Sequence, residues 1–271
     1  MVSLMNYSNH TINNNSQDRI LSYSKMCNLV YGKTFNHKLL GFSSQKMIRG
    51  TFNRAFCRIL KSDSECVVLF RGTRELYMDW PTNLLCWPAR VDLNDFQCKV
   101  HAGFLNGVTG RRVCHKFRRA IDVLKELLQP VLCGDPPTRL VFIGHSLGGA
   151  YAVLAAAMIE AEHSGTVSEV VTFGQPAVGG RSFKEWYKSV GLHDRTTRFM
   201  HEADIVTFLP GPRFEHVGTG WWSSGGKWLS QLGWHERIAR AWNTRRVLQF
   251  IGDHSVKNYV EICRNLPPSF P

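Results

Sequence analysis

The sequence lacks any long apolar segment. No apolar run in its 271 residues approaches the roughly 18 residues needed to cross a bilayer, and the longest, residues 147–159, contains two glycines. The first residues are polar and lack the basic and then apolar pattern of a secretory signal. We therefore expect residues 1–17 to form a flexible N-terminal extension and the protein to be cytoplasmic, with export by a route that uses no signal peptide left open.

Paired cysteines and acidic residues are scarce as well. None of the eight cysteines stands in a C-x-x-C pair, which argues against a zinc site, and without an export signal we expect them to stay reduced. The chain has 21 acidic residues against 33 lysines and arginines, a net charge of +12 that suits attraction to an anionic surface. The basic residues are scattered and carry no fingerprint of a nucleic-acid-binding module, so we expect no nucleic-acid partner.

The apolar residues that are present predict one α/β domain over residues 18–271. At 44% hydrophobic, the chain can bury a sizeable core, and it shows no internal repeat. Short apolar runs alternate with helical patterns, which is typical of a mostly parallel sheet covered on both faces. The expected strands are 51–60, 66–70, 97–101, 140–143, 170–173 and 196–200. The expected helices are 20–31, 103–130, 150–159, 182–190 and a last one after residue 255.

A G-x-S-x-G motif is centred on Ser146, between one of these strands and a helix. In that setting the turn pushes the serine hydroxyl out above the sheet, and Gly144 and Gly148 leave room for a turn too sharp for side chains. The helix N-terminus directs free backbone N–H groups, including that of Leu147, at an oxygen that becomes anionic. The motif therefore indicates a nucleophile. The alternative is a glycine-rich turn in which the serine only caps the helix.

A serine nucleophile needs a histidine to take its proton and a carboxylate to orient that histidine. In this kind of fold the chain order is serine, acid, histidine, and the groups lie beyond the carboxyl ends of strands. Asp204 follows the strand expected at 196–200 and precedes an apolar stretch that can shield a carboxylate from water. We therefore favour Asp204 as the acid over Glu202 and Asp194.

Three histidines follow Asp204 in the chain, and His254 is the favoured base. It stands in a turn that opens a helix, so a loop can deliver its side chain to the top of the sheet. His216 is expected within a strand, where a structural role suits it better, and His235 is expected on an amphipathic helix.

With these residues in place, the sequence resembles the class 3 lipases, the fungal-lipase-like branch of the α/β-hydrolases. The matching segments fall in the family's order and cover roughly residues 50–262. They are V-L-F-R-G-T (68–73), D-W (79–80) with N-L (83–84), V-H-A-G-F (100–104), G-H-S-L-G-G-A (144–150), T-F-G-Q-P (172–176) with V-G (178–179), D-I-V (204–206) with L-P (209–210), H-V-G (216–218), and H-S (254–255) with Tyr259.

The resemblance implies an α/β-hydrolase fold, with a mostly parallel central sheet and helices on both faces, and a catalytic triad of Ser146, Asp204 and His254. It also implies an oxyanion hole built from Thr73 and the backbone N–H of Leu147. In the family the stretch after this threonine forms a lid, which here is the apolar segment 75–87. Its tryptophans and leucines could cover the site in water and face lipid when open. A loop packed permanently on the core is the alternative.

The sequence departs from the family pattern in three places. Ala177 stands where many relatives carry arginine, and His201 where an asparagine is common, which makes the fine positioning of Asp204 less secure. The segment 218–250 looks longer than the family needs and holds five of the eight tryptophans. If this segment forms a helix, its arginines lie on one face and its apolar residues on the opposite face. The apolar face comprises Trp228, Leu232, His235, Ala239 and Trp242. Such a helix suits a membrane surface, a cap on the core or a dimer contact.

These patterns predict a serine carboxylic-ester hydrolase that acts on tri-, di- or monoacylglycerol through an acyl-enzyme intermediate, without a metal or other cofactor. A phospholipase A-type acyl hydrolase is one alternative, and a lipase-like protein that binds without cleaving is another. The basic surface and the apolar segments also suit peripheral contact with a lipid surface or membrane. The sequence does not indicate an oligomeric state.

Overall fold

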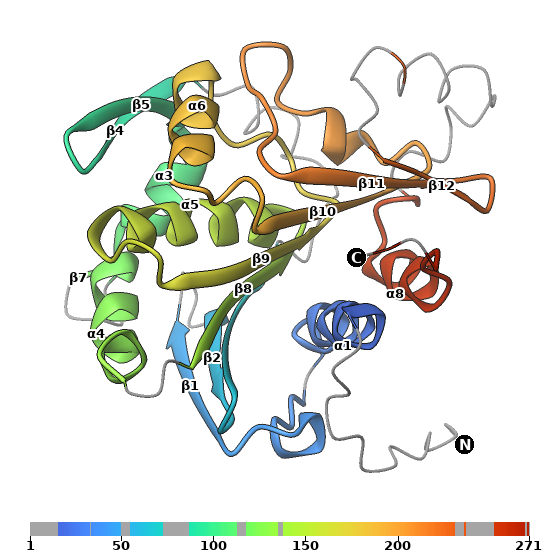
Figure 1. Cartoon of the computed structure of the whole chain (residues 1–271), viewed down its shortest axis with the longest axis horizontal. Coiled ribbons are helices and arrows are strands. Elements are labelled where there is room, and N and C mark those ends of the chain that lie inside the picture. Colours follow the sequence, from blue (N-terminus) through green and yellow to red (C-terminus); the bar gives the residue numbers. More distant parts are fainter. Residues whose placement is uncertain are drawn as a thin grey trace.

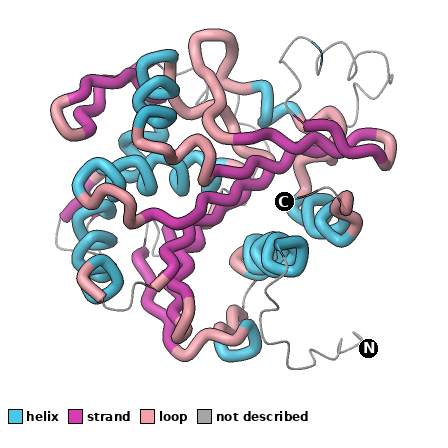
Figure 2. The backbone as a smooth tube through the Cα atoms, viewed as in Figure 1, coloured by secondary structure: helices cyan, strands magenta, loops and turns pink. Residues whose placement is uncertain are grey.

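An eight-stranded sheet forms the centre of the computed structural model, which describes residues 16–32, 34–49, 55–72, 87–112, 118–134, 138–230, 236, 252–268 and 270 (Figures 1 and 2). The strand order is β1-β2-β3-β8-β9-β10-β11-β12. The strands are β1 (Ser44–Arg49), β2 (Ala55–Lys61), β3 (Glu65–Phe70), β8 (Arg139–His145), β9 (Val167–Phe173), β10 (Thr196–His201), β11 (Thr219–Ser224) and β12 (Lys227–Ser230). Strands β3, β8, β9, β10 and β11 run parallel, and β1, β2 and β12 add antiparallel edges, so the expected mostly parallel sheet is confirmed.

Helices cover both faces of this sheet, as Figure 1 shows. One face carries α3 (Ala102–Thr109), α4 (Ala120–Leu132), α5 (Leu147–Glu162) and α6 (Arg181–Ser189). The other face carries α1 (Ser16–Leu29) and α8 (Val256–Arg264), which pack side by side. The remaining elements are the 3-10 helices η1 (Lys38–Leu40) and η4 (Ile205–Phe208) and the strand pairs β4 (Pro88–Leu93) with β5 (Phe96–His101) and β6 (Arg111–Arg112) with β7 (Arg118–Arg119).

The central strands β3, β8 and β9 are mostly apolar because their side chains pack into the cores on both faces of the sheet. Successive side chains of a strand point to opposite faces. In β3, Val68 and Phe70 belong to the core that includes the α5 side chains, while Val67 and Leu69 belong to the core beneath α1 and α8. A strand that is buried on both faces has a continuous run of apolar residues in its sequence. Such runs allowed β3, β8 and β9 to be predicted.

The N-terminal boundary of the domain differs from the expected one. Helix α1 begins at Ser16, and the Gln17 side chain donates a hydrogen bond to the Pro267 carbonyl at 3.0 Å. Residues 16 and 17 therefore belong to the folded domain rather than to an extension. The expected extension at residues 1–15 lies outside the described residues.

The single long helix expected over residues 103–130 is wrong. Helix α3 ends at Thr109, the chain is extended at Gly110, and Arg111 and Arg112 pair with Arg119 and Arg118 before α4 begins. The apolar spacing of each helix was recognised correctly, but spacing alone does not reveal a short strand pair between two helices. The strand expected at 97–101 exists as β5, but it pairs with β4 outside the central sheet.

The amphipathic helix expected to include Trp228 is also wrong at that residue. Trp228 lies in β12, which forms a hairpin with β11 through Gly225 and Gly226, both of which have positive φ. A Gly-Gly pair between two apolar runs is a hairpin signal that overrides helical spacing. The Trp228 indole donates to the Asn265 carbonyl at 2.7 Å. The rest of the expected helical face lies outside the described residues. No helix in the described part of the chain is long and apolar enough to cross a membrane.

Candidate active site

Ser146 lies on the turn between β8 and α5. Its backbone has φ 60° and ψ −133°, a conformation that costs a non-glycine residue about 1–3 kcal/mol. Its N–H donates to the Phe173 carbonyl at 2.9 Å, which ties the turn to the end of β9. The Ser146 side chain makes no capping hydrogen bond to α5, so the interpretation of this serine as a helix cap is wrong.

The glycines beside Ser146 allow this turn, as the motif predicted. A Cβ on Gly144 would lie 2.3 Å from the Gly148 carbonyl carbon, and a Cβ on Gly148 would lie 2.6 Å from the Phe70 carbonyl oxygen. Both distances are too short for real side chains. The turn therefore packs directly against the end of β3, the strand that leads to Thr73.

Asp204 follows β10 and is fully buried. Its Oδ1 accepts a hydrogen bond from the Val206 N–H at 2.9 Å, and its Oδ2 accepts one from the Tyr259 hydroxyl at 2.5 Å. A buried carboxylate is costly unless its oxygens are hydrogen-bonded. These two donors offset part of that cost and fix the plane of the carboxylate.

His254 lies against Asp204, as the sequence predicted. Its Nδ1 is 2.9 Å from Asp204 Oδ1 and 2.8 Å from Oδ2, and both side chains are buried. An ionised carboxylate can only accept, so Nδ1 carries the proton and Nε2 has the lone pair that can take a proton from a hydroxyl. The structure therefore brings together the favoured acid and the favoured base.

The other acids and histidines have different surroundings. Glu202 accepts hydrogen bonds from Ser224 Oγ and the Gly225 N–H, so it holds the β11–β12 hairpin, and Asp194 is exposed. His216 Nε2 contacts the Thr207 carbonyl at 2.9 Å in a structural role, although it stands just before β11 rather than within a named strand. His235 lies outside the described residues.

Two further contacts hold the loop that carries His254. Asp253 Oδ2 accepts a hydrogen bond from the Ala203 N–H at 3.2 Å, which ties this loop to the residue before the acid. His145 Nε2 lies 2.9 Å from the His254 carbonyl oxygen, and the two imidazole rings are 4.7 Å apart. Because His145 directly precedes Ser146, this contact places the base loop beside the nucleophile turn.

Gly174, at the end of β9, packs against the acid and the base together. Its φ is 56°, and a Cβ there would lie 2.8 Å from Asp204 Oδ2, 3.0 Å from the Tyr259 hydroxyl and 3.1 Å from His254 Cε1. The sequence placed Gly174 in a matching segment but assigned it no role. Glycine is required because any side chain would displace the Asp204–His254 pair.

Sequence reasoning missed Tyr31, His145, Tyr259 and Gly174 as parts of the site. Tyr259 and Gly174 stood in segments quoted for the resemblance, and His145 is the variable position of G-x-S-x-G. Tyr31, whose hydroxyl lies 3.1 Å from His145 Nδ1, carried no signal at all, because only the folded chain brings the residues after α1 to the nucleophile turn.

Parts of the expected site lie outside the described residues. Leu147 is the first residue of α5, so its N–H has no acceptor within that helix and is available to an oxyanion. Thr73, the expected second member of the oxyanion hole, lies outside the described residues, as do residues 75–86 of the expected lid. Trp87, at the end of that segment, is 79% exposed.

The two single-residue departures from the family pattern, Ala177 and His201, coincide with other contacts around the acid. The Ala177 N–H donates to the Leu209 carbonyl at 2.8 Å, and the His201 ring makes an edge contact with the Tyr259 ring. Within the described ranges, no three His, Cys, Asp or Glu side chains gather as a metal site requires.

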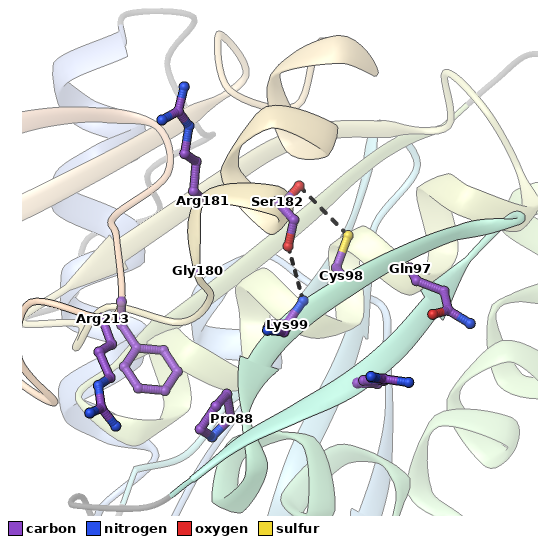
Figure 3. A pocket seen from close by; sticks show the side chains of 10 residues that line it. Pro88, Gln97, Cys98, Lys99, Gly180, Arg181, Ser182 and Arg213 are labelled. Atoms are coloured by element: carbon purple, nitrogen blue, oxygen red, sulfur yellow. Dashed lines mark hydrogen bonds between the residues drawn. The ribbon is translucent and has the colours of Figure 1, made fainter.

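A hollow of about 630 Å³, which no triad residue lines, lies between the β4–β5 hairpin and the start of α6 (Figure 3). Four cationic residues line it, and no acidic one does; they are Arg90, Lys99, Arg181 and Arg213. Figure 3 shows Arg181 and Arg213 pointing in opposite directions, and Arg181 forms an ion pair with Glu185 at 2.8 Å. The hydroxyl of Ser182 accepts from the Lys99 N–H and attaches the hairpin to α6.

Comparison with known proteins identifies the family. The family model described as lipase (class 3) matches residues 67–214, more than half of the chain. The chain is 32% identical over 165 residues to the secreted mono- and diacylglycerol lipase 1 of Fusarium solani, covering 60% of this chain and 45% of that protein. It is 31% identical over 163 residues to a chloroplastic phospholipase A(1) of Arabidopsis thaliana, covering 56% of this chain and 35% of that protein. The matches thus span less than half of the length of these relatives.

The fold has close counterparts among solved structures. The crystal structure of a lipase from Rhizopus microsporus var. chinensis superposes with a TM-score of 0.63 at 23% identity, covering 88% of this chain and 85% of that one. The shared arrangement is the mostly parallel sheet with helices on both faces that the motifs predicted. The chain belongs to the class 3 lipases and has the α/β-hydrolase fold.

Proposed function

We propose that this chain is a serine carboxylic-ester hydrolase that acts on lipid esters. The observation that carries the proposal is the buried Asp204–His254 pair, held beside a serine on a strained strand-to-helix turn. Strain at one residue and burial of a carboxylate both cost stability, so their coincidence at one place favours a catalytic role. Membership of the class 3 lipases supports the same conclusion.

In the proposed reaction, Ser146 Oγ attacks the ester carbonyl while His254 Nε2 takes the hydroxyl proton. Asp204 holds the His254 ring in the tautomer whose Nε2 carries the accepting lone pair, and it stabilises the imidazolium that forms. The Leu147 N–H, at the positive end of α5, stabilises the tetrahedral oxyanion together with Thr73, whose role follows from the resemblance. His254 then protonates the leaving alcohol, and water releases the acyl group by the same route.

Acylglycerols are the proposed substrates, in agreement with the name of the Fusarium solani relative. The phospholipase A(1) relative from Arabidopsis thaliana supports a phospholipase A-type acyl hydrolase as the second candidate, because both substrates present the same ester to the same triad. A protein that only binds lipid is less favoured. Such a protein has no use for a strained serine and a buried carboxylate at the same turn.

Labelling with a fluorophosphonate probe, together with a chain-length series of nitrophenyl esters, tests the proposal. We expect labelling and turnover in the wild-type protein and the loss of both in Ser146→Ala. Ser189→Ala is the control, because this serine lies in α6 and its Oγ is bonded to the Trp186 carbonyl. If the wild-type protein turns over no ester in a Ser146-dependent manner, the hydrolase proposal is wrong.

Competition in mixed micelles separates the two substrate classes. Diacylglycerol and phosphatidylcholine with different labelled acyl chains are offered together, and the released fatty acids are compared. An excess of acid from diacylglycerol supports the acylglycerol lipase, and an excess from phosphatidylcholine supports the phospholipase.

We also propose that the basic hollow contacts the surface of an anionic membrane. Trp87 is 79% exposed and stands next to Pro88 at the rim of the hollow. Arg90, Lys99 and Arg213 have no acidic partner among the described residues, and a basic residue near an anionic membrane contributes about 1 kcal/mol. Exposed tryptophan beside such residues is typical of a lipid interface.

Sedimentation with lipid vesicles tests this contact. We expect the Lys99→Glu, Arg213→Glu double variant to bind phosphatidylglycerol-containing vesicles at least about tenfold more weakly than the wild type, with turnover of soluble esters unchanged. The Lys46→Glu, Lys227→Glu double variant changes the net charge equally on exposed positions of β1 and β12 and is the control. Equal weakening in both variants would mean that net charge alone governs binding.

A further inference from the structure

Three residues from separate parts of the chain form a continuous hydrogen-bonded row that ends at the proposed base. The hydroxyl of Tyr31, just after α1, lies 3.1 Å from His145 Nδ1. His145 Nε2 lies 2.9 Å from the carbonyl oxygen of His254. None of these contacts involves the triad side chains, and Tyr31 lies outside the residues 67–214 that the family model matches.

The direction of each hydrogen bond follows from the chemistry of the groups. A carbonyl oxygen can only accept, so His145 Nε2 must carry a proton and donate it to the His254 carbonyl. In the neutral ring, Nδ1 then has a lone pair, and the Tyr31 hydroxyl donates to it. Burial lowers the pKa of His145 well below its ordinary value, and the neighbouring His254 lowers it further, so the His145 ring stays neutral.

The Tyr31 hydroxyl also contacts Gly72, which follows the end of β3. Burial raises the pKa of Tyr31, while the Gly72 backbone, which lies against this hydroxyl, lowers it. A Cβ on Gly72 would lie 2.3 Å from this hydroxyl and 3.2 Å from the Ser146 Cβ. Tyr31 therefore contacts both the residue before Thr73 and, through His145, the loop of the base.

We propose that Tyr31 and His145 are positioning residues that hold the main chain of His254 in register with the Ser146 turn. This role rests on the proposed hydrolase function. Asp204 orients the imidazole ring through Nδ1, and the Asp253 side chain ties the loop to Ala203, but neither contact is made by the main chain of His254. The bond from His145 to the His254 carbonyl restrains the backbone itself, and its donor is the residue adjacent to the nucleophile.

The expected consequence is a defect in turnover rather than in substrate binding. A misplacement of a catalytic group by about 1 Å costs about 10²-fold in rate, because proton transfer requires hydrogen-bond distance. Tyr31 and His145 do not contact the ester in this scheme. Their loss should therefore lower kcat and the rate of fluorophosphonate labelling by similar factors and leave KM nearly unchanged.

Tyr31→Phe removes the hydroxyl and keeps the ring. We expect kcat on a short, soluble nitrophenyl ester to fall about tenfold, with KM within about twofold of the wild-type value. Tyr187→Phe is the matched control, since it also removes a hydroxyl that shares a hydrogen bond, here with Thr196 at 2.8 Å, on the opposite face of the sheet. The control should lose thermal stability and retain kcat.

Two substitutions of His145 separate positioning from folding. His145→Leu removes the donor, and we expect kcat about 10²-fold below the wild type. His145→Gln keeps an amide N–H that can reach the His254 carbonyl, and we expect it to recover at least about tenfold of that loss. Thermal unfolding of both variants identifies any protein that has not folded.

The outcomes distinguish the two proposals. If wild-type labelling does not depend on Ser146, the hydrolase function itself is wrong. If wild-type labelling does depend on Ser146 and Tyr31→Phe retains the wild-type kcat, the hydrolase stands and the positioning role is overturned. Equal kcat in His145→Leu and His145→Gln would likewise overturn it, because a donor to the His254 carbonyl would then be irrelevant.

Discussion

Tyr259 donates a hydrogen bond of 2.5 Å to Asp204 Oδ2, the carboxylate oxygen that also lies 2.8 Å from His254 Nδ1. The tyrosine comes from α8, the helix that begins two residues after His254. One short segment therefore supplies the proposed base and a donor to its acid, so that α8 fixes both ends of the Asp204–His254 contact.

Removal of this donor should weaken both stability and turnover. Hydrogen bonds to charged groups contribute about 1.5–3 kcal/mol, so we expect Tyr259→Phe to lower the free energy of unfolding by that amount. We also expect kcat to fall about tenfold, which corresponds to about 1.4 kcal/mol in the activation free energy. Denaturant unfolding and ester kinetics measure the two effects. An unchanged kcat with lowered stability would show that Asp204 needs no support from Tyr259.

A methyl group at position 174 should disrupt the acid and the base together. Gly174→Ala places a Cβ 2.8 Å from Asp204 Oδ2, and we expect kcat to fall by about 10²-fold or more as the pair shifts. Gly165→Ala is the matched control, because Gly165 also has a positive φ, of 77°, but nothing lies within 4 Å of its added Cβ. Both variants lose stability through backbone strain, and only Gly174→Ala should lose activity. Equal kinetics would contradict this assignment.

Replacement of the strained serine should stabilise the fold. Ser146→Gly relieves a conformation that costs about 1–3 kcal/mol. The extra entropy of glycine in the unfolded chain offsets about 0.5–1 kcal/mol of that stabilisation. We expect the midpoint of thermal unfolding to rise by about 2–4 °C while labelling is abolished. Ser189→Gly, at the last residue of α6, should instead lower the midpoint, because it removes the hydrogen bond from Ser189 Oγ to the Trp186 carbonyl. A lower midpoint in Ser146→Gly would contradict the presence of stored strain.

The stability of the protein should decrease in mild acid partly because of His145. Its pKa is lowered in the folded state, so below about pH 6.5 the unfolded chain binds a proton that the native state does not. Stability is therefore intact above the unfolded pKa and decreases as pH falls below it, by up to about 1.4 kcal/mol per pH unit for one such group.

Unfolding free energies of the wild type and His145→Gln between pH 6.5 and pH 5 measure this contribution. We expect a shallower pH dependence in the variant. His193, whose pKa is also lowered, is present in both proteins and cancels in the difference. Parallel curves would show that His145 is protonated in the folded protein.

The reach of sequence reasoning is clearest at the triad. The acid was selected from several candidates by its position after an expected strand, and the base by its position in a turn that opens an expected helix. The structure brings Asp204 and His254 into contact. The same reasoning was wrong for Trp228, because helical spacing of tryptophans was preferred to the Gly225-Gly226 turn signal. Spacing describes a pattern of burial, and a hairpin packed on one side of a sheet can produce a similar pattern.

Short-range interactions determine several features of this protein, and the sequence alone predicts them. These are the buried parallel strands, the turn at Ser146 that its glycines permit, and the helix that begins at Leu147. Each of these depends on residues within about one element of one another, so composition and spacing are sufficient. The contacts of Tyr31 with His145 and of His145 with the His254 carbonyl join residues 114 and 109 positions apart, respectively. No local pattern specifies such pairs, because they form only when the sheet order brings α1, β8 and the loop before α8 to the same edge. Tertiary structure alone therefore decided how the base is held.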